Sequence, residues 1–277
     1  MPFRIEVAGD IAACARTVPI QEEVWSGDVA VPPQLLLAIV RSGGFVANGY
    51  VDGDPEPAGF VFGFAAIHGQ RIRHHSHMLA LRAPHRHTGL AIALKEAQRE
   101  HCLAQGIAIM TWTMDPLEAR NARFNLSTLG AYAREYHRDF YGPMPDKLNA
   151  GLPSDRLTVL WPIGTERVVR RLRGTEQSPA LEQADAEPIR YLLRAERDRS
   201  VELDPPRGEP QLLLEIPRDI QALKRQDPAL ALAWRYTLRT ALEAAFAAGY
   251  AAVGFLRGAD GRGAYLLGPP PLTGGTA

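Results

Sequence analysis

Apolar residues recur with two different periods along this chain of 277 residues, and together they predict a mixed α+β fold. Runs with the length and alternation of strands lie at 3–7, 45–51, 58–68, 72–81, 107–113, 131–137 and 157–163. Helical spacing, bounded by capping residues, prolines and glycines, lies at 10–25, 34–41, 90–105 and 117–129. The expected order over residues 1–163 is therefore β-α-α-β-β-β-α-β-α-β-β.

The remainder of the chain has a different character and predicts a second, smaller α/β region. Residues 164–210 are rich in arginine, glutamate and proline and include a predicted linker at 174–187. A β-α-α-β-β pattern follows, with a strand at 212–216, helices beginning at 217 and 227, and a closing hairpin at 250–267. The sequence thus predicts two domains, residues 1–163 and a C-terminal extension, 164–277.

The turn between the fourth strand and the long helix carries the clearest candidate chemistry. It reads Arg86-x-x-Gly89-x-Ala91, and the first amides of a helix have no partner inside the helix. The helix dipole adds positive potential there, small residues let an anion approach the backbone, and Arg86 adds charge-assisted hydrogen bonds. These features predict a site for a pyrophosphate.

This turn, in this order of elements, resembles the acyl-CoA signature of the GNAT (GCN5-related) N-acetyltransferases, in particular a bacterial subgroup with a C-terminal extension. The resemblance implies a GNAT fold, a mixed sheet that splays between its fourth and fifth strands, with acetyl-CoA or succinyl-CoA entering the gap. It also implies three sets of cofactor-binding residues. These are the fourth-strand amides of Met78, Leu79 and Leu81, the turn residues Arg86, His87, Thr88, Gly89, Leu90 and Ala91, and Asn121 and Asn125 on the next helix.

The resemblance also implies a general base and a general acid for acyl transfer. His75 and His77 share one face of the fourth strand, and a neutral imidazole can accept the proton of an ammonium group. Many members of the family protonate the thiolate with a tyrosine four residues before a Gly-Ala or Gly-Phe pair. Here that position is Leu126, so the usual acid is missing, and Tyr141 becomes a looser candidate.

Three charged residues are candidates for binding the acceptor, an amine of a small molecule such as an amino acid. Asp115 ends the fifth strand and can bind an ammonium group or cap the next helix. Arg138 and Arg156 lie in polar segments near the last strands and can hold a carboxylate in a bidentate pair. The sequence does not identify the acceptor or the acyl group. It also leaves the role of the C-terminal extension undetermined, and a homodimer contact is one option.

Composition narrows the classes of partner and compartment. Lysine plus arginine and aspartate plus glutamate both number 31, which argues against nucleic acid and polybasic substrates. Cys14 and Cys102 give neither a disulfide framework nor metal-ligand spacing, which fits a reducing, cytoplasmic setting. No apolar run approaches the ~18 residues of a membrane span.

Two other functions remain as alternatives. A metal-dependent hydrolase would use the cluster His74–His77, with His75 and His77 as a ligand pair, although no carboxylate follows closely. A non-catalytic module that binds CoA would need the turn but no base or acid. The expectation favoured here is an N-acyltransferase that uses acyl-CoA and no metal.

Overall fold

The structure is a computed structural model that describes residues 3–25, 30–144, 150–176, 178–186, 189–196, 199–202 and 204–271. Its internal contacts divide the chain into two compact units, Met1–Trp112 and Thr113–Ala277. This division does not test the domain boundary predicted at residue 163, which stays a prediction. Each unit combines a mixed sheet with helices, so the predicted α+β class is confirmed.

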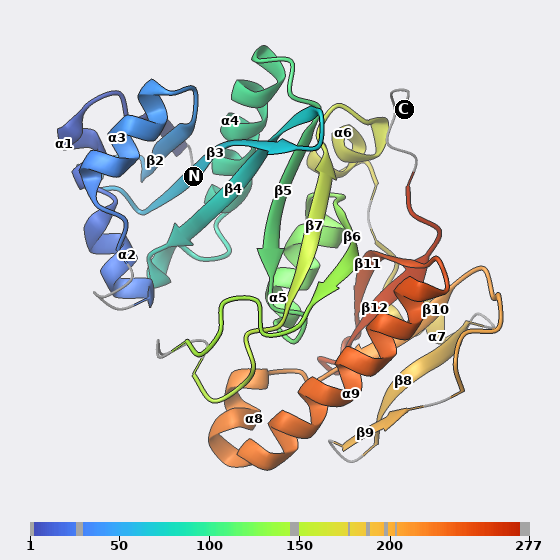
Figure 1. Cartoon of the computed structure of the whole chain (residues 1–277). Coiled ribbons are helices and arrows are strands. Elements are labelled where there is room, and N and C mark those ends of the chain that lie inside the picture. Colours follow the sequence, from blue (N-terminus) through green and yellow to red (C-terminus); the bar gives the residue numbers. More distant parts are fainter. Residues whose placement is uncertain are drawn as a thin grey trace. The chain divides into compact units, whose positions relative to one another are not determined.

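The first unit is built on a sheet with the strand order β1-β2-β3-β4-β5 (Figure 1). Its strands are β1 Phe3–Val7, β2 Phe45–Val51, β3 Gly59–His68, β4 Arg71–Leu81 and β5 Ile109–Met114, of which β5 runs on to the start of the second unit. Neighbours are antiparallel except β4 and β5, which are parallel. The strands predicted from the apolar pattern are therefore all present, with small differences at their ends.

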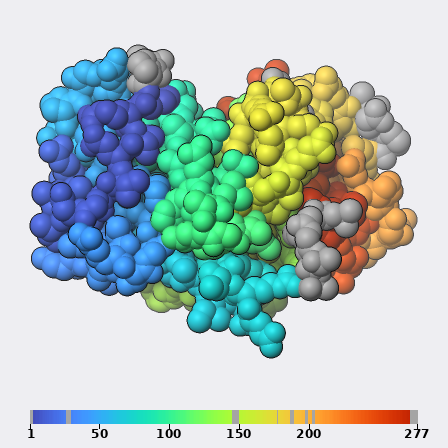
Figure 2. All heavy atoms as spheres, turned by 90° about the horizontal axis from the view of Figure 1, so that it is seen from above, coloured from blue at the N-terminus to red at the C-terminus, as the bar shows by residue number. Residues whose placement is uncertain are grey.

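Helices cover both faces of this sheet. The helices α1 Ile11–Ala15, α2 Val18–Trp25 and α3 Pro33–Arg41 pack on one face, around buried Phe60 and Leu36. The opposite face carries α4 Leu90–Ala104, whose Leu90 and Leu94 pack on Phe45. In the space-filling view the β3–β4 hairpin, in cyan, projects from the surface of this unit (Figure 2).

The single helix predicted over residues 10–25 is wrong, because the chain forms two helices there. Asp10 does cap α1, since its carboxylate accepts from the amide of Ala13 at 2.8 Å. Pro19 has no N–H to donate to the preceding turn, and its ring crowds the carbonyl four residues earlier. The helix therefore ends at Ala15, and Thr17 Oγ1 donates to Cys14 O at 2.9 Å in the break.

An inserted residue in β4 reverses the faces to which its side chains point. Phe62 is paired with Met78 but its neighbour Gly63 is paired with Ser76, which leaves His77 as a β-bulge. Before the bulge, Ser76 faces α4; after it, Met78 packs with the α1–α3 layer. Regular alternation would have put Ser76 and Met78 on one face.

The second unit contains a seven-stranded sheet in the order β7-β6-β11-β12-β10-β8-β9. Its strands are β6 Tyr132–His137, β7 Arg156–Pro162, β8 Arg190–Glu196, β9 Arg199–Glu202, β10 Leu212–Ile216, β11 Ala251–Arg257 and β12 Gly263–Gly268. Its helices are α5 Ala119–Ala122, a π-helical segment η3 Arg123–Thr128, α6 Glu166–Leu172, α7 Leu181–Ala186, α8 Ile220–Gln226 and α9 Pro228–Ala247. The C-terminal strands continue the sheet of β6 through the pair Ala252 and Ala133.

The β-α-α-β-β pattern predicted from residue 212 onward is confirmed as β10, α8, α9, β11 and β12. Sequence reasoning missed α6, α7, β8 and β9, and α7 lies inside the predicted linker. These elements are short, and their buried side chains lie among arginines and glutamates, as Val168 does in α6 and Leu193 in β8. The helix predicted over 117–129 is also wrong in detail, since it consists of α5 and the π-helical segment.

Candidate active site

The predicted phosphate turn joins β4 to α4 and exposes an arginine beside the first turn of a 15-residue helix. His87 and Gly89 both adopt left-handed backbone angles, with φ of +66° and +98°. Thr88 Oγ1 donates to His85 O at 2.7 Å, which fixes the loop. A Cβ at residue 89 would find room, 3.5 Å from the Phe3 ring, so glycine is required there for its backbone angle. The turn thus presents helix amides and the exposed guanidinium of Arg86 together.

β4 leaves one backbone edge free next to this turn. It pairs with β5 through His74 with Met110 and His75 with Thr111. From Ser76 to Leu81, the strand pairs with β3, and within the described part of this unit it has no partner on its other edge. The backbone of the predicted cofactor-binding residues Met78, Leu79 and Leu81 belongs to this half of the strand. Their role in binding CoA stays a prediction.

The two candidate bases lie together on the face of the sheet opposite α4. The ring centroids of His75 and His77 are 5.8 Å apart, and His77 also contacts Phe62 and Phe64 at 5.6 and 5.9 Å. Burial, with the charge of His77 as a smaller cause, lowers the pKa of His75 to about 4, and burial lowers the pKa of His77 as well. Both imidazoles are therefore neutral at pH 7 and able to accept a proton.

His74 faces the other way, into a buried polar network that sequence reasoning missed. Gln98 Nε2 lies 3.1 Å from His74 Nε2, and Gln98 Oε1 accepts from Ser76 Oγ at 2.8 Å. Lys95 Nζ donates to Ser76 Oγ at 2.7 Å and lies 3.8 Å from the centroid of the Trp112 ring. Burial lowers the pKa of Lys95 to about 7 and that of His74 to about 3. Lys95 therefore links β4 to β5 just beyond the last pair of residues that joins the two strands.

The histidines of the alternative metal site lie beside aromatic rings. Among the described residues, no group of three or more histidine, cysteine, aspartate or glutamate side chains is arranged to hold a metal ion. His75 and His77 contact phenylalanine rings instead of a third ligand. Within the described ranges, no helix combines the length and apolar character needed to span a bilayer.

In the second unit, Asp115 lies in a buried network of charges. Its Oδ1 accepts from the amide of Leu117 at 2.8 Å, but the next helix, α5, begins at Ala119 with Glu118 as its N-cap, so the cap expected from Asp115 is wrong. Its Oδ2 accepts from Arg235 Nη2 at 2.6 Å, and Arg156 Nη1 lies 3.7 Å from the same oxygen. The structure therefore brings the predicted residues Asp115 and Arg156 together and adds Arg235 of α9, which sequence reasoning missed.

Two further predicted residues lie at the surface of the same unit. The Tyr141 hydroxyl lies 3.1 Å from Thr113 Oγ1, and the Arg156 guanidinium lies 5.3 Å from the centroid of the Tyr141 ring. Arg138 forms two hydrogen bonds with Glu243, at 2.7 and 2.5 Å. Tyr141 is thus close to the charged network, whereas Arg138 already has a carboxylate partner.

The helix expected to carry cofactor-binding amides contains a π-helical segment, a distortion that often marks functional positions. Asn125 within it is buried, and its Nδ2 lies 3.1 Å from Met114 Sδ. Asn121 is exposed on α5. Leu126, at the position of the missing tyrosine, is fully buried. Whether either asparagine contacts CoA stays a prediction.

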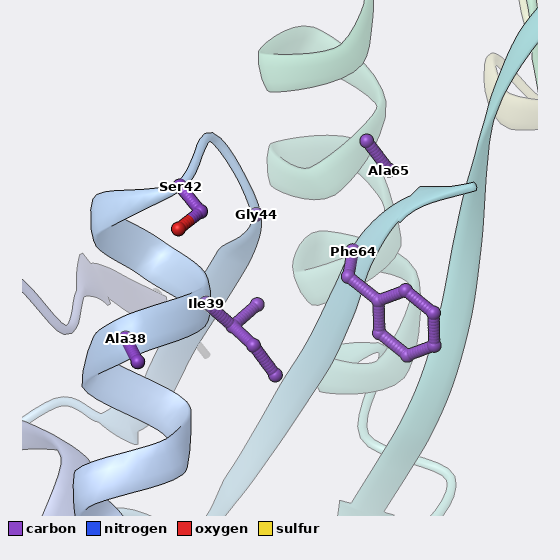
Figure 3. Close-up of a pocket in the computed structure, with 6 residues that line it drawn as sticks. All are labelled: Ala38, Ile39, Ser42, Gly44, Phe64 and Ala65. Atoms are coloured by element: carbon purple, nitrogen blue, oxygen red, sulfur yellow. The ribbon is translucent and has the colours of Figure 1, made fainter. Parts of the chain in front are cut away.

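A small pocket of about 220 Å³ lies between α3 and β3 of the first unit. Ile39 and Phe64 line it from these two elements (Figure 3). Phe64 also contacts the ring of His75, at 5.3 Å between centroids, so the pocket adjoins the two histidines. Its walls are mainly apolar, and it therefore suits a small apolar group.

Comparisons with known proteins found similar structures and no similar sequences. No family model and no curated protein matches the sequence. The NatC complex bound to Gag peptide and CoA contains a chain with 16% identity and a TM-score of 0.46, over 58% of this chain and 99% of its own. The ribosomal-protein-S18-alanine N-acetyltransferase from Escherichia coli has 14% identity and a TM-score of 0.45, over 59% and 96%. An acetyltransferase of the GNAT family from Streptococcus pneumoniae has 15% identity and a TM-score of 0.46, over 57% and 98%.

Proposed function

We propose that this chain is a GNAT-type N-acyltransferase, which moves an acyl group from acyl-CoA to the amine of a small molecule. The observation that carries the proposal is the half-paired β4 followed at once by the turn of Arg86 and Gly89. An unpaired strand edge offers hydrogen bonds to the amides of a pantetheine arm, and the helix amides and Arg86 suit its pyrophosphate. All of these groups belong to the first unit.

The transfer needs a nucleophile, a polarised carbonyl and a leaving group. The amine nitrogen attacks the thioester carbon, and the C–N bond forms as the C–S bond breaks. His77 accepts the proton that the ammonium group loses, directly or through water, with His75 as the second candidate. Backbone amides near Met78 stabilise the oxyanion. CoA leaves as a thiolate, which needs little help because free thiols are moderately acidic.

The acyl group is acetyl in the simplest version of the proposal, with succinyl as the alternative. A succinyl chain needs a cation near its free carboxylate. Arg82, the arginine that directly follows β4, donates to Glu23 Oε2 at 2.7 Å and to Pro57 O at 3.1 Å. Because these partners already engage the Arg82 guanidinium, acetyl-CoA is the first co-substrate to test.

Calorimetric titration of the full chain with CoA and acetyl-CoA tests the binding half of the proposal. Gly89→Val should weaken CoA binding at least tenfold, because a β-branched residue resists a left-handed angle and covers the helix amides. Gly69→Val is the matched control, since Gly69 also has a positive φ, of +61°, and lies on the β3–β4 hairpin. Arg86→Glu with Arg71→Glu as its control tests the charge.

Mass spectrometry of amine acceptors incubated with acetyl-CoA tests the transfer half. A mass increase on one acceptor, lost in His77→Ala or His75→Ala, is the expected result. Binding of CoA with no product on any amine would instead identify a CoA-binding module without transferase activity. No binding of CoA by the unmodified chain would show that the turn at Arg86 is an ordinary helix start.

A further inference from the structure

The pocket between α3 and β3 is lined by uncharged residues and opens to solvent (Figure 3). Its six lining residues are Ala38, Ile39, Ser42, Gly44, Phe64 and Ala65. Three of them, Ala38, Ser42 and Ala65, are exposed, whereas Ile39 and Phe64 are half-buried. A lining without a cation does not suit a phosphate group, so this pocket is separate from the proposed pyrophosphate site at Arg86.

Close packing fixes both walls of the pocket. The amide of Gly44 donates to Ile39 O at 2.9 Å, and a Cβ at residue 44 would collide with Ile39 Cγ2. The Ile39 side chain therefore packs directly on the Gly44 backbone. On the other wall, Phe64 packs against the same apolar cluster as Ile39, and its ring centroid lies 5.9 Å from that of Phe62. The pocket is thus formed without a ligand, as ligand pockets usually are.

The volume of the pocket sets the size of the group that it can hold. Its volume of about 220 Å³ is smaller than the roughly 300–1,000 Å³ of pockets that bury a whole drug-sized ligand. Apolar cavities of about 150 Å³ bind benzene. The pocket therefore fits one side group of a larger molecule, such as a branched alkyl chain or a phenyl ring.

The contacts of Phe64 connect this pocket to the two candidate bases. The centroid of the Phe64 ring lies 5.3 Å from that of His75 and 5.9 Å from that of His77. Burial lowers the pKa of both imidazoles, so neither carries a charge at pH 7 that would repel an ammonium group. All of these residues belong to the first unit. A molecule with its amine at His75 or His77 can therefore bury an adjoining apolar group beside Phe64.

We propose that this pocket binds an apolar side group of the acceptor. The inference rests on the proposed function and gives it a substrate class, amines that carry a branched alkyl or phenyl group close to the nitrogen. Two kinds of molecule present this chemistry. One is a plain amine such as 3-methylbutylamine, and the other is the amino acid with the same side group, L-leucine.

Binding followed by NMR on the full chain without CoA tests the pocket separately from the transfer. The amines are ethylamine, 2-methylpropylamine, 3-methylbutylamine and 2-phenylethylamine, and the matching amino acids are L-alanine, L-valine, L-leucine and L-phenylalanine. Each methylene group buried should strengthen binding about two- to fourfold. The ligand with three more carbons, 3-methylbutylamine or L-leucine, should therefore bind at least about eightfold more tightly than ethylamine or L-alanine. The imidazole signals of His75 and His77 should shift with the same ligands.

Opposite changes of volume at Ile39 test where the side group binds. Ile39→Ala enlarges the pocket and should move the tightest binding to the larger ligands. Ile39→Phe fills the pocket and should reduce the eightfold preference to within twofold. Leu35→Phe is the matched control, because it adds an aromatic ring to the same helix at a position that is 51% exposed and outside the pocket lining, and it should keep the preference. A general loss of stability would not shift the preferred size in two directions.

The outcomes separate the pocket from the function on which it rests. A size preference among the amines or among the amino acids supports the inference and identifies the kind of acceptor. Equal affinity within both series, or no binding by the unmodified chain, overturns it whether or not the variants fold. So does a preference that folded Ile39→Phe retains. Transfer to amines regardless of size would support the transferase while the pocket inference fails, and a size preference without CoA binding would do the reverse.

Discussion

Each unit buries cations beside polar groups, but the two units compensate them in different ways. In the first unit, Lys95 donates to the neutral hydroxyl of Ser76 and lies over the ring of Trp112, and burial lowers its pKa to about 7. In the second unit, Arg235 is equally buried and is held by Asp115. A lysine can lose its charge when it is buried, whereas an arginine cannot. Buried arginine therefore requires an anion, and buried lysine permits a change of protonation.

The largest expected effect comes from removing the anion that Arg235 requires. Asp115→Asn leaves Arg235 buried without its carboxylate partner, and breaking such a pair costs about 3–5 kcal/mol. Chemical denaturation at pH 7 should show the loss of stability. Glu243→Gln is the control, because Glu243 pairs with the exposed Arg138, and it should lower stability far less. Equal effects of the two substitutions would show that burial does not distinguish these pairs.

A smaller effect of opposite sign is expected for the buried lysine. Lys95→Met removes an ammonium group that is costly to bury and keeps a side chain of similar length, so it should stabilise the protein below pH 7 by about 1–3 kcal/mol. The folded protein holds fewer protons than the unfolded chain between the folded pKa of about 7 and the usual 10.5. The stability of the unmodified protein should therefore rise with pH across that window.

Denaturation of both proteins from pH 6 to 10 measures this prediction. The advantage of Lys95→Met should shrink as pH rises, because the unmodified protein then holds a neutral amine. A constant difference between the two proteins would show that Lys95 keeps its charge state throughout, and that the comparison with Arg235 is wrong.

The smallest of these effects is expected at His74. Its pKa of about 3 in the folded state lies below the usual 6.5, so its neutral form contributes stability above pH 6.5 that is lost as pH falls towards 3. His74→Leu should remove about 1–2 kcal/mol of the stability loss between pH 6.5 and 4. Thermal denaturation in that range measures the difference. Parallel pH profiles of the two proteins would contradict it.

Local features were the part of the molecule that the sequence predicted well. The strands at 45–51 and 72–81, the cap at Asp10 and the turn at Gly89 depend on a few adjacent residues. The missed break before Pro19 also had a local signal, the proline itself. Short polar elements such as α7 gave no such signal, because their buried residues are few.

The candidate site was predicted only where its partners are close in sequence. His75 and His77 are two residues apart, and their shared face follows from strand geometry. Asp115 and Arg235 are separated by 120 positions, and no spacing rule connects them. Lys95 read as an ordinary helix former, and only the packing of α4 on Ser76 and Trp112 reveals that it is buried.

The β-bulge at His77 has a consequence for how this chain can diverge. A substitution at residue 77 changes one side chain, so the identity of the candidate base is free to vary between lineages. Deletion of that residue would leave Ser76 opposite Gly63 and Met78 opposite Phe62 in regular alternation, so Met78 and the later side chains of β4 would keep the faces that they have now. The length of this segment can therefore change by the one bulged residue without turning the rest of the strand over.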